Sequence, residues 1–274
     1  MILKFIKNSS DIIKYNENQI YIKPHDLLKP YIAHYTVSFP TSSIVINKLT
    51  IIPDASGCFI FTFYENKVES SVWGATTKTV IVSSGMENYY VRVFVEFLPG
   101  GLFYFTKENQ IDLTNMQMSL WQVNNHIHSL VAQAFEQAID LENFLERLNF
   151  ILLPYVIEKS SSLILINAIE KLKVSKGIIS VRELSIFSNY SERHMNRIFK
   201  EHIGMNIKTF SRLIRINASI QNMKDKKIIL SSLAQDSGFY DEAHFIHDFK
   251  SICGVTPMKY LSNMSSFYNE IFKF

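Results

Sequence analysis

The sequence predicts an α+β protein, in which an N-terminal domain of strands with a helical segment precedes an all-α C-terminal domain. Three observations lead to this prediction. Up to about residue 113, short runs of β-branched and aromatic residues alternate with turn residues. From about residue 116 the apolar residues recur with a helical period. Near the C-terminus one helical sequence is written twice. We therefore expect domains over 1–157 and 160–264, followed by a tail over 265–274.

The N-terminal strands are expected in runs such as CFIFTFYENK, KTVIVSS and YYVRVFVEFL. Turn residues separate these runs, among them Pro53-Asp54, Gly85 and Pro99-Gly100-Gly101. Several short strands at this spacing predict a small barrel or sandwich.

The segment from about 116 to 155 is expected to be helical. One apolar stripe contains Ile127, Leu130 and Ala134, and a second runs from Leu141 to Leu152. These stripes either form dimer contacts or pack on the strands of their own chain, and we favour a homodimer. A further helix is expected over 163–174, with Gly177 as its C-terminal cap.

The repeated sequence is RHMNRIFKEHIG at 193–204 and AHFIHDFKSICG at 243–254. The two copies align without a gap. Upstream, the alignment requires one extra residue in the second copy and then pairs Tyr190 with Phe239. Two copies are too few for a solenoid, so the repeat indicates a duplicated functional element.

Each copy is predicted to form a helix-turn-helix. In the first, a short helix contains Val181 and Leu184, a turn follows at 188–190, and Ser191 caps a second helix ending near Ile203. A helical pattern from Asn206 to about Met223 joins the copies. A helix of about 18 residues spans roughly 27 Å. With the two copies attached, it can hold two recognition helices about 34 Å apart, one turn of DNA.

A polar stripe on the second helix of copy one is predicted to contact DNA. It consists of Arg193, Asn196, Arg197 and Lys200, spaced i, i+3, i+4 and i+7. Arginine and asparagine match the edges of guanine and adenine, and a lysine suits a phosphate. The alternative is a solvated helix face without a ligand. The charge distribution favours DNA binding over a solvated face, because residues 160–274 hold 16 of the chain's 28 Lys and Arg but only 10 of its 25 Asp and Glu.

The region from about 163 to 262 resembles the DNA-binding domain of AraC/XylS-type regulators. The resemblance is carried by VRELSIFSNYSERHMNRIFKEHIGMNIKTFSRLIR and by LSSLAQDSGFYDEAHFIHDFKSICGVTPMKY. It implies a bacterial transcription regulator with two helix-turn-helix motifs that binds promoter DNA. It also implies activation through RNA polymerase, and often a homodimer. A constitutive architectural DNA-binding protein, whose barrel only dimerises, is the alternative.

The second copy departs from the first in its predicted DNA-facing residues, which are Ala243, Ile246, His247 and Lys250. Members of the family usually have arginine at the position of His247. Copy one is therefore expected to supply most of the base discrimination, while copy two mainly docks. In the linker helix, Arg212 and Arg215 either bind phosphate or brace the two copies through carboxylates.

The N-terminal half is similar to the cupin-like sensor half of some of these regulators. This weaker resemblance rests on YIKPHDLLKPYIAHY, IIPDASGCFIFTFYENK and VFVEFLPGGLFYF. It implies a small-molecule effector, but no particular one. The candidate ligand contacts are Phe61, Trp73, Arg92, Phe94 and Glu96. Alternatively, the rings fill the core, and Arg92 and Glu96 form a surface pair.

Composition argues against several other functions. The strand region offers only His25 and His34, both upstream of the main strands, so neither a metal-dependent enzyme nor a cofactor is expected. No nucleophile and base occur in a catalytic arrangement, and we expect no catalytic residues and no metal. Cys58 and Cys253 stand alone, as is usual in a reducing compartment. No apolar run reaches the ~18 residues of a membrane span. A cytoplasmic protein that does not bind membranes is therefore expected.

Overall fold

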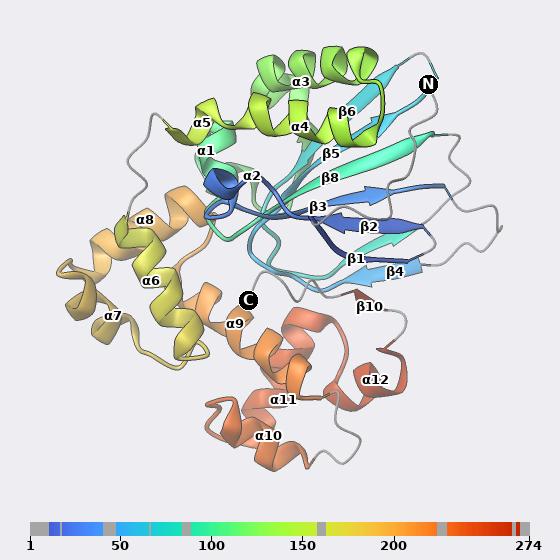
Figure 1. The fold of residues 1–274 in the computed structure, drawn as a ribbon. Coiled ribbons are helices and arrows are strands. Elements are labelled where there is room, and N and C mark those ends of the chain that lie inside the picture. Colours follow the sequence, from blue (N-terminus) through green and yellow to red (C-terminus); the bar gives the residue numbers. More distant parts are fainter. Residues whose placement is uncertain are drawn as a thin grey trace.

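The fold consists of a β-rich N-terminal half and a helical C-terminal half (Figure 1). It is seen in a computed structural model that describes residues 11–16, 18–40, 48–65, 67–83, 89–157, 163–223, 229–264 and 267–268. The helices α3 and α4 cover one face of the large sheet, and the C-terminal helices lie on its other side (Figure 1). The predicted α+β class is confirmed. The expected tail over 265–274 is described only at residues 267–268.

The large sheet has seven antiparallel strands in the order β1-β2-β3-β8-β5-β6-β9. Its strands are β1 (Ile12–Tyr15), β2 (Gln19–Ile22), β3 (Ile32–Ser38), β5 (Cys58–Phe63), β6 (Val68–Trp73), β8 (Val91–Phe97) and β9 (Gln117–Ser119). A smaller sheet has the order β10-β4-β7, with β4 (Lys48–Ile51), β7 (Val80–Ser83) and β10 (Phe267–Tyr268). The two residues of β10, near the C-terminus, thus pair with β4 of the N-terminal half.

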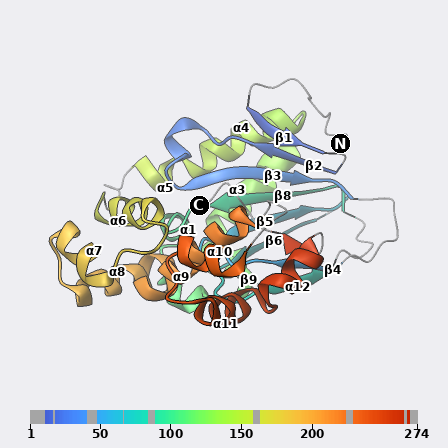
Figure 2. The same cartoon turned by 90° about the horizontal axis from the view of Figure 1, so that it is seen from below.

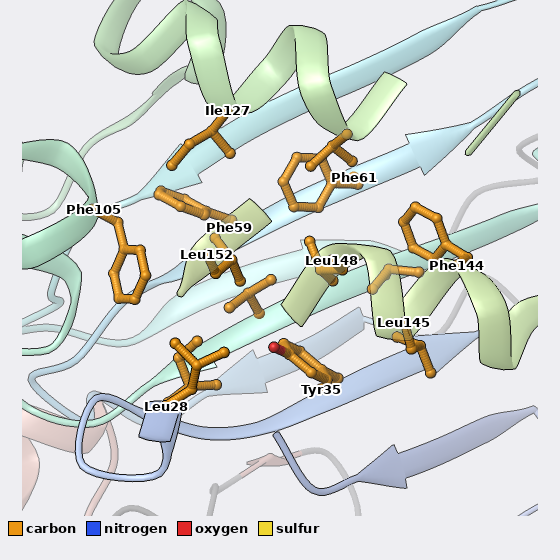
Figure 3. Packing of buried hydrophobic residues seen from close by; sticks show 14 of the residues in the cluster. Leu28, Tyr35, Phe59, Phe61, Phe105, Ile127, Phe144, Leu145, Leu148 and Leu152 are labelled. Carbon is orange, nitrogen blue, oxygen red and sulfur yellow. The ribbon is translucent and has the colours of Figure 1, made fainter. Parts of the chain in front are cut away.

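The N-terminal core lies between the large sheet and the helices α3 (Leu120–Gln137) and α4 (Leu141–Leu152). Side chains alternate between the faces of a strand, so every second residue of β8 faces this core. Phe59 and Phe61 of β5 point toward α3, with Phe59 beside Ile127, and Phe144 and Leu148 of α4 belong to the same layer (Figure 3). Five residues of the α4 stripe are buried in this core: Leu141, Phe144, Leu145, Leu148 and Leu152. The buried residues of these helical stripes therefore pack on the strands of their own chain, and the homodimer stays a prediction.

The segment after β8 differs from its predicted extended structure. Residues up to about 113 were expected in strands, but α1 (Leu102–Thr106) and α2 (Gln110–Leu113) occupy its end. The aromatic residues of LFYF favour a strand by composition. However, Lys107 adopts a left-handed conformation that ends α1, and the side chain of Asn109 caps α2. The first residues of the expected helical segment belong instead to β9. The short helix α5 (Pro154–Ile157) ends the described part of this half.

The C-terminal helices closely follow the sequence prediction. They are α6 (Leu163–Val174), α7 (Val181–Ser188), α8 (Glu192–Ile203), α9 (Ile207–Asn222), α10 (Leu230–Asp236), α11 (Glu242–Cys253) and α12 (Pro257–Ser262). Gly177 follows α6 with φ +73°, as expected of a C-terminal cap. Seen from below, α9, α10 and α11 lie under the strands of the large sheet (Figure 2).

The two halves share a second core. Ile52, Ala55 and Ala75 of the N-terminal half are buried in the same cluster as the apolar faces of α6 to α11. The buried amide Nδ2 of Asn217 donates to the carbonyl oxygen of Pro53 at 3.0 Å. Because these contacts are buried, the placement of α9 depends on the N-terminal half.

The end of α8 is also held by the N-terminal half. The hydroxyl of Thr114, just after α2, donates to the carbonyl oxygen of Gly204 at 2.9 Å. The ring of Phe103 on α1 lies 3.9 Å, centroid to centroid, from the ring of His202. The second helix of copy one is thereby joined directly to the half expected to act as a sensor.

Candidate nucleic-acid interface

The two copies of the repeat form the same local structure, α7–α8 and α10–α11. The Ser191 hydroxyl accepts the His194 backbone N–H at 3.2 Å, and the Asp241 carboxylate accepts that of His244 at 2.7 Å. Glycines with positive φ end both second helices, Gly204 at +88° and Gly254 at +74°. Left-handed glycine and a side-chain cap are sequence signals that act locally, which is why the repeat predicts both helices well.

The interiors of the two copies also match. Phe199 of α8 meets Phe210 of α9 with ring centroids 5.7 Å apart and an interplanar angle of 65°. The aligned pair in copy two, Phe249 and Tyr260, has the same separation and an angle of 67°. All four rings are buried. Each second helix is therefore fixed from behind by an edge-to-face aromatic pair, so its opposite face is held toward solvent.

Three of the four predicted DNA-facing residues of copy one share an exposed stripe of α8: Arg193, Arg197 and Lys200. The side chain of Arg197 is 64% exposed, and its Nη1 lies 3.4 Å from the Glu201 carboxylate one turn later. An exposed pair of this kind contributes little free energy. Arg197 can therefore leave Glu201 for a nucleic-acid partner at small cost.

The structure places Asn196 differently from the prediction. Its Nδ2 donates to the carbonyl oxygen of Glu192 at 3.0 Å, and its Oδ1 accepts the backbone N–H of Ile207 at 3.2 Å. Ile207 is the first residue of α9, where backbone donors lack a partner within the helix. Asn196 thus caps the linker helix from the side of α8, and we remove it from the set of base contacts.

Copy two presents fewer cationic groups than copy one. Ala243, His247 and Lys250 are exposed, whereas Ile246 is partly buried against the second core. His247 is 80% exposed, and its Nδ1 lies 3.7 Å from the carboxylate of Asp248. The stripe therefore offers one lysine and one histidine where copy one offers two arginines and a lysine.

Sequence reasoning missed Tyr240. It is the extra residue of the second copy, standing between Phe239, which aligns with Tyr190, and the cap Asp241. Tyr240 is 91% exposed at the start of α11. The alignment of the two copies already contains this signal, because the inserted residue stands immediately before the cap of α11 and changes the surface beside that helix.

Comparison with known proteins agrees with this geometry. A family model described as a helix-turn-helix domain matches residues 184–263. The multiple antibiotic resistance protein MarA of Escherichia coli is 29% identical over 87 residues, which are 31% of this chain and 68% of MarA. This region is similar to helix-turn-helix domains of the AraC type, and we refer to it as the AraC-type domain. The match begins at Leu184 in α7 and ends just after α12.

Other relatives match the AraC-type domain over a similar length. An uncharacterized HTH-type transcriptional regulator of Haemophilus influenzae is 27% identical over 85 residues, 31% of this chain and 28% of the relative. The F1 operon positive regulatory protein of Yersinia pestis is 28% identical over 82 residues, 30% of this chain and 27% of the relative. The chain thus spans less than a third of the length of these two relatives. Among solved structures, ToxT from Vibrio cholerae shares 16% identity, covering 85% of this chain and 98% of ToxT, with a TM-score of 0.40.

Arg212 braces the AraC-type domain internally. Its guanidinium donates two hydrogen bonds to the Asp248 carboxylate, Nε to Oδ2 at 3.0 Å and Nη2 to Oδ1 at 2.8 Å. The same Nη2 donates to the Ser251 hydroxyl at 2.9 Å. Of the two roles left open by the sequence, the structure therefore places Arg212 in the brace between the copies, and the predicted DNA contact is corrected.

Arg215 makes a second link and is likewise corrected as a DNA contact. Its Nη1 donates to the Gly238 carbonyl oxygen at 3.4 Å, and its guanidinium carbon lies 4.8 Å from the Phe239 ring centroid. Burial lowers the pKa of the Arg215 guanidinium, and the nearby Asp248 carboxylate opposes that shift. Arginine remains charged in either case. These contacts turn the Arg215 side chain toward copy two.

The five predicted ligand contacts do not share one face of the sheet. Phe61 is fully buried under α3 and α4 (Figure 3), so this ring fills the core and does not face the same space as the others. The positions of the other two rings and of the carboxylate follow from the cross-strand register. Cys58 pairs with Trp73 and Glu96, and Ile60 pairs with Phe94. These residues therefore lie on the face of the sheet opposite to Phe61.

Arg92 lies on that second face, half-buried, and its Nε donates to the Thr62 hydroxyl at 3.1 Å. Among the hollows lined by described residues, one of about 610 Å³ lies beside Trp121 and one of about 100 Å³ lies beside Tyr35, and neither of these is lined by a predicted ligand contact. Phe61 is removed from the ligand set, and the other four residues remain a prediction.

Two further features concern ligands and membranes. Within the described ranges, no three His, Cys, Asp or Glu side chains are grouped so that they could hold a metal ion. In the same part of the chain, no helix has both the length and the apolar character needed to cross a bilayer.

Proposed function

We propose that this chain is a sequence-specific DNA-binding transcription regulator, most simply an activator, that acts in the cytoplasm. The observation that carries the proposal is the pair of matched helix-turn-helix copies, each with an exposed second helix, joined by α9 (Figure 1). The 16 residues of α9 span about 24 Å at 1.5 Å per residue. With the bodies of the copies added, this length suits two successive major-groove segments on one face of a duplex.

The two copies are proposed to contribute unequally. Arg193 and Arg197 are the candidate base contacts of copy one, and Lys200 is its candidate phosphate contact. In copy two, Ala243, Ile246, His247 and Lys250 dock the helix with less discrimination, and the exposed Tyr240 adds a contact at the edge of the groove. The names of the relatives, which include transcriptional regulators and a positive regulatory protein, support this assignment.

Footprinting tests the DNA-binding proposal. On duplexes enriched from a random library by the full chain, we expect protection of two groove segments about one helical turn apart. Binding should also weaken with salt, with a log–log slope of about −4 or steeper if four or more phosphates are contacted. Protection of one segment only, or a flat salt dependence, contradicts the proposal.

We also propose that the N-terminal half modulates DNA binding through a small molecule or a protein partner. The direct contacts of Thr114 with Gly204 and of Phe103 with His202 support this, because a change in α1 or α2 reaches the recognition helix α8 without an intermediary. RNA polymerase and a homodimeric state remain proposals that rest on the family resemblance.

Calorimetry with a library of small molecules separates a sensor from a constitutive architectural protein. A true effector is expected to raise the melting temperature of the chain and to change its affinity for the enriched duplex, because binding to one folded arrangement stabilises that arrangement. If compounds that raise the melting temperature leave DNA affinity unchanged, the N-terminal half does not regulate through them. The architectural alternative is then preferred.

A further inference from the structure

A bidentate ion pair within the AraC-type domain joins α9 to α11, the second helix of copy two. We propose that the Arg212–Asp248 ion pair sets the angle of α11 relative to α9, and thereby the spacing of the two DNA segments that the chain accepts. The inference rests on the proposed function, since it concerns how two recognition helices are positioned. Arg212 and Asp248 are positioning residues in this proposal, and neither contacts DNA.

The geometry of the pair fixes orientation as well as distance. The two parallel bonds of 3.0 and 2.8 Å hold the planar guanidinium in line with the carboxylate. The third bond, to Ser251, reaches the next turn of the same face of α11. A lysine at position 212 supplies charge but no fork, so it cannot define the same plane.

Arg215 provides a second anchor one turn further along α9. It contacts the carbonyl oxygen of Gly238 and the ring of Phe239, both in the turn between α10 and α11. The two arginines are three residues apart and so lie on one face of α9. Arg212 binds α11 and Arg215 binds the turn before it. Two separate contacts restrain rotation of copy two about either one.

Copy one is joined to the same helix by different contacts. Asn196 accepts the first N–H of α9, and Phe199 packs against Phe210. Because none of these groups touches Asp248, a change at position 212 or 248 is expected to move copy two and leave copy one in place. The ion pair thus joins α9 to copy two and not to copy one.

The energetics of buried ion pairs favour a positioning role over a stabilising one. The side chain of Asp248 is 6% exposed and that of Arg212 is 30% exposed. Replacing both members of such a pair by apolar residues often leaves stability unchanged, whereas removing one member leaves an uncompensated charge. Without Arg212, the Asp248 carboxylate would lie beside His247, near the proposed DNA surface, with the His244 imidazole at 3.7 Å and the Arg215 guanidinium nearby. A double replacement is therefore the cleaner test.

The test uses the full chain in which Arg212→Met and Asp248→Leu are combined. Its DNA partners are duplexes enriched by the wild-type chain. In these duplexes, one to three base pairs are then inserted or deleted between the two contacted segments. For the wild type, one base pair of change should cost about tenfold in affinity or more, because it shifts the second segment along and around the helix. The double variant should lose less than about threefold per base pair and bind the optimal duplex only modestly less tightly.

Two further variants make the result decisive. The double variant Glu170→Leu/Lys173→Met removes a 3.6 Å ion pair within α6 and should keep the wild-type spacing dependence. Arg212→Lys, which retains the charge, should give intermediate tolerance, and it carries the test if the apolar double variant fails to fold. The inference is overturned, while the proposed function stands, if the apolar double variant and Arg212→Lys both lose as much affinity per inserted or deleted base pair as the wild type. Failure of the wild type to enrich a two-part sequence overturns the proposed function itself.

Discussion

Replacing Arg197 by alanine is expected to weaken binding to the enriched duplex by about 1–3 kcal/mol and to relax base preference at one position. Arg197 lies in the middle of the exposed stripe of α8, and its only described ionic partner is Glu201, 3.4 Å away on the surface. The side chain is therefore free to form two hydrogen bonds with a guanine. The measurement is equilibrium binding to the enriched duplex and to duplexes substituted at each position in turn.

Two matched variants separate base recognition from charge. Lys200→Ala should weaken binding to all duplexes by a similar factor. It should also reduce the slope of log affinity against log salt concentration by about one, the contribution of one phosphate contact. His247→Ala, at the aligned position of Arg197 in copy two, should have the smaller effect on specificity. If His247→Ala reduces specific binding more than Arg197→Ala does, the proposed inequality between the copies is wrong.

Much of the helical half was predictable because its signals are local. Ser191 before α8, Gly204 after it and the period of apolar residues between them are each read within a few residues of the helix they define. The repeat then gave the second copy without further assumptions. The linker helix was predicted within one residue at each end for the same reason, since Asn206 caps it with its side chain.

The sequence could not show which polar residues turn inward. Asn196 and Arg197 are neighbours on one polar stripe, and only the tertiary contact with Ile207 separates a structural amide from an exposed guanidinium. Arg212 finds its carboxylate 36 residues away, so the pattern along α9 cannot reveal the pairing. The sheet raises the same difficulty. Alternation separates Phe94 from Val93 within one strand, but it does not say which face α3 and α4 cover.

A second large effect is expected at Gly204, where alanine should lower the free energy of unfolding by about 3–4 kcal/mol. Gly204 has φ +88°, and a Cβ atom there would lie 2.1 Å from the Thr114 hydroxyl oxygen and 2.7 Å from the Gln110 carbonyl oxygen. The first contact could be relieved by a rotation of the side chain, but the second is with backbone of α2. The chain must therefore strain the end of α8 or separate it from the N-terminal half. Urea unfolding of the full chain measures the loss.

Gly254 is the matched control, because it ends α11 in the same way but not against the N-terminal backbone. Its φ is +74°, and the nearest atom to an added Cβ would be the Thr79 hydroxyl oxygen at 3.3 Å. Gly254→Ala should therefore cost about 1–2 kcal/mol, the usual penalty of a left-handed alanine. The difference between the two glycines then measures the contact between α8 and α2. Equal losses would mean that this contact yields without resistance, and the direct route from the N-terminal half to the first recognition helix would have to be abandoned.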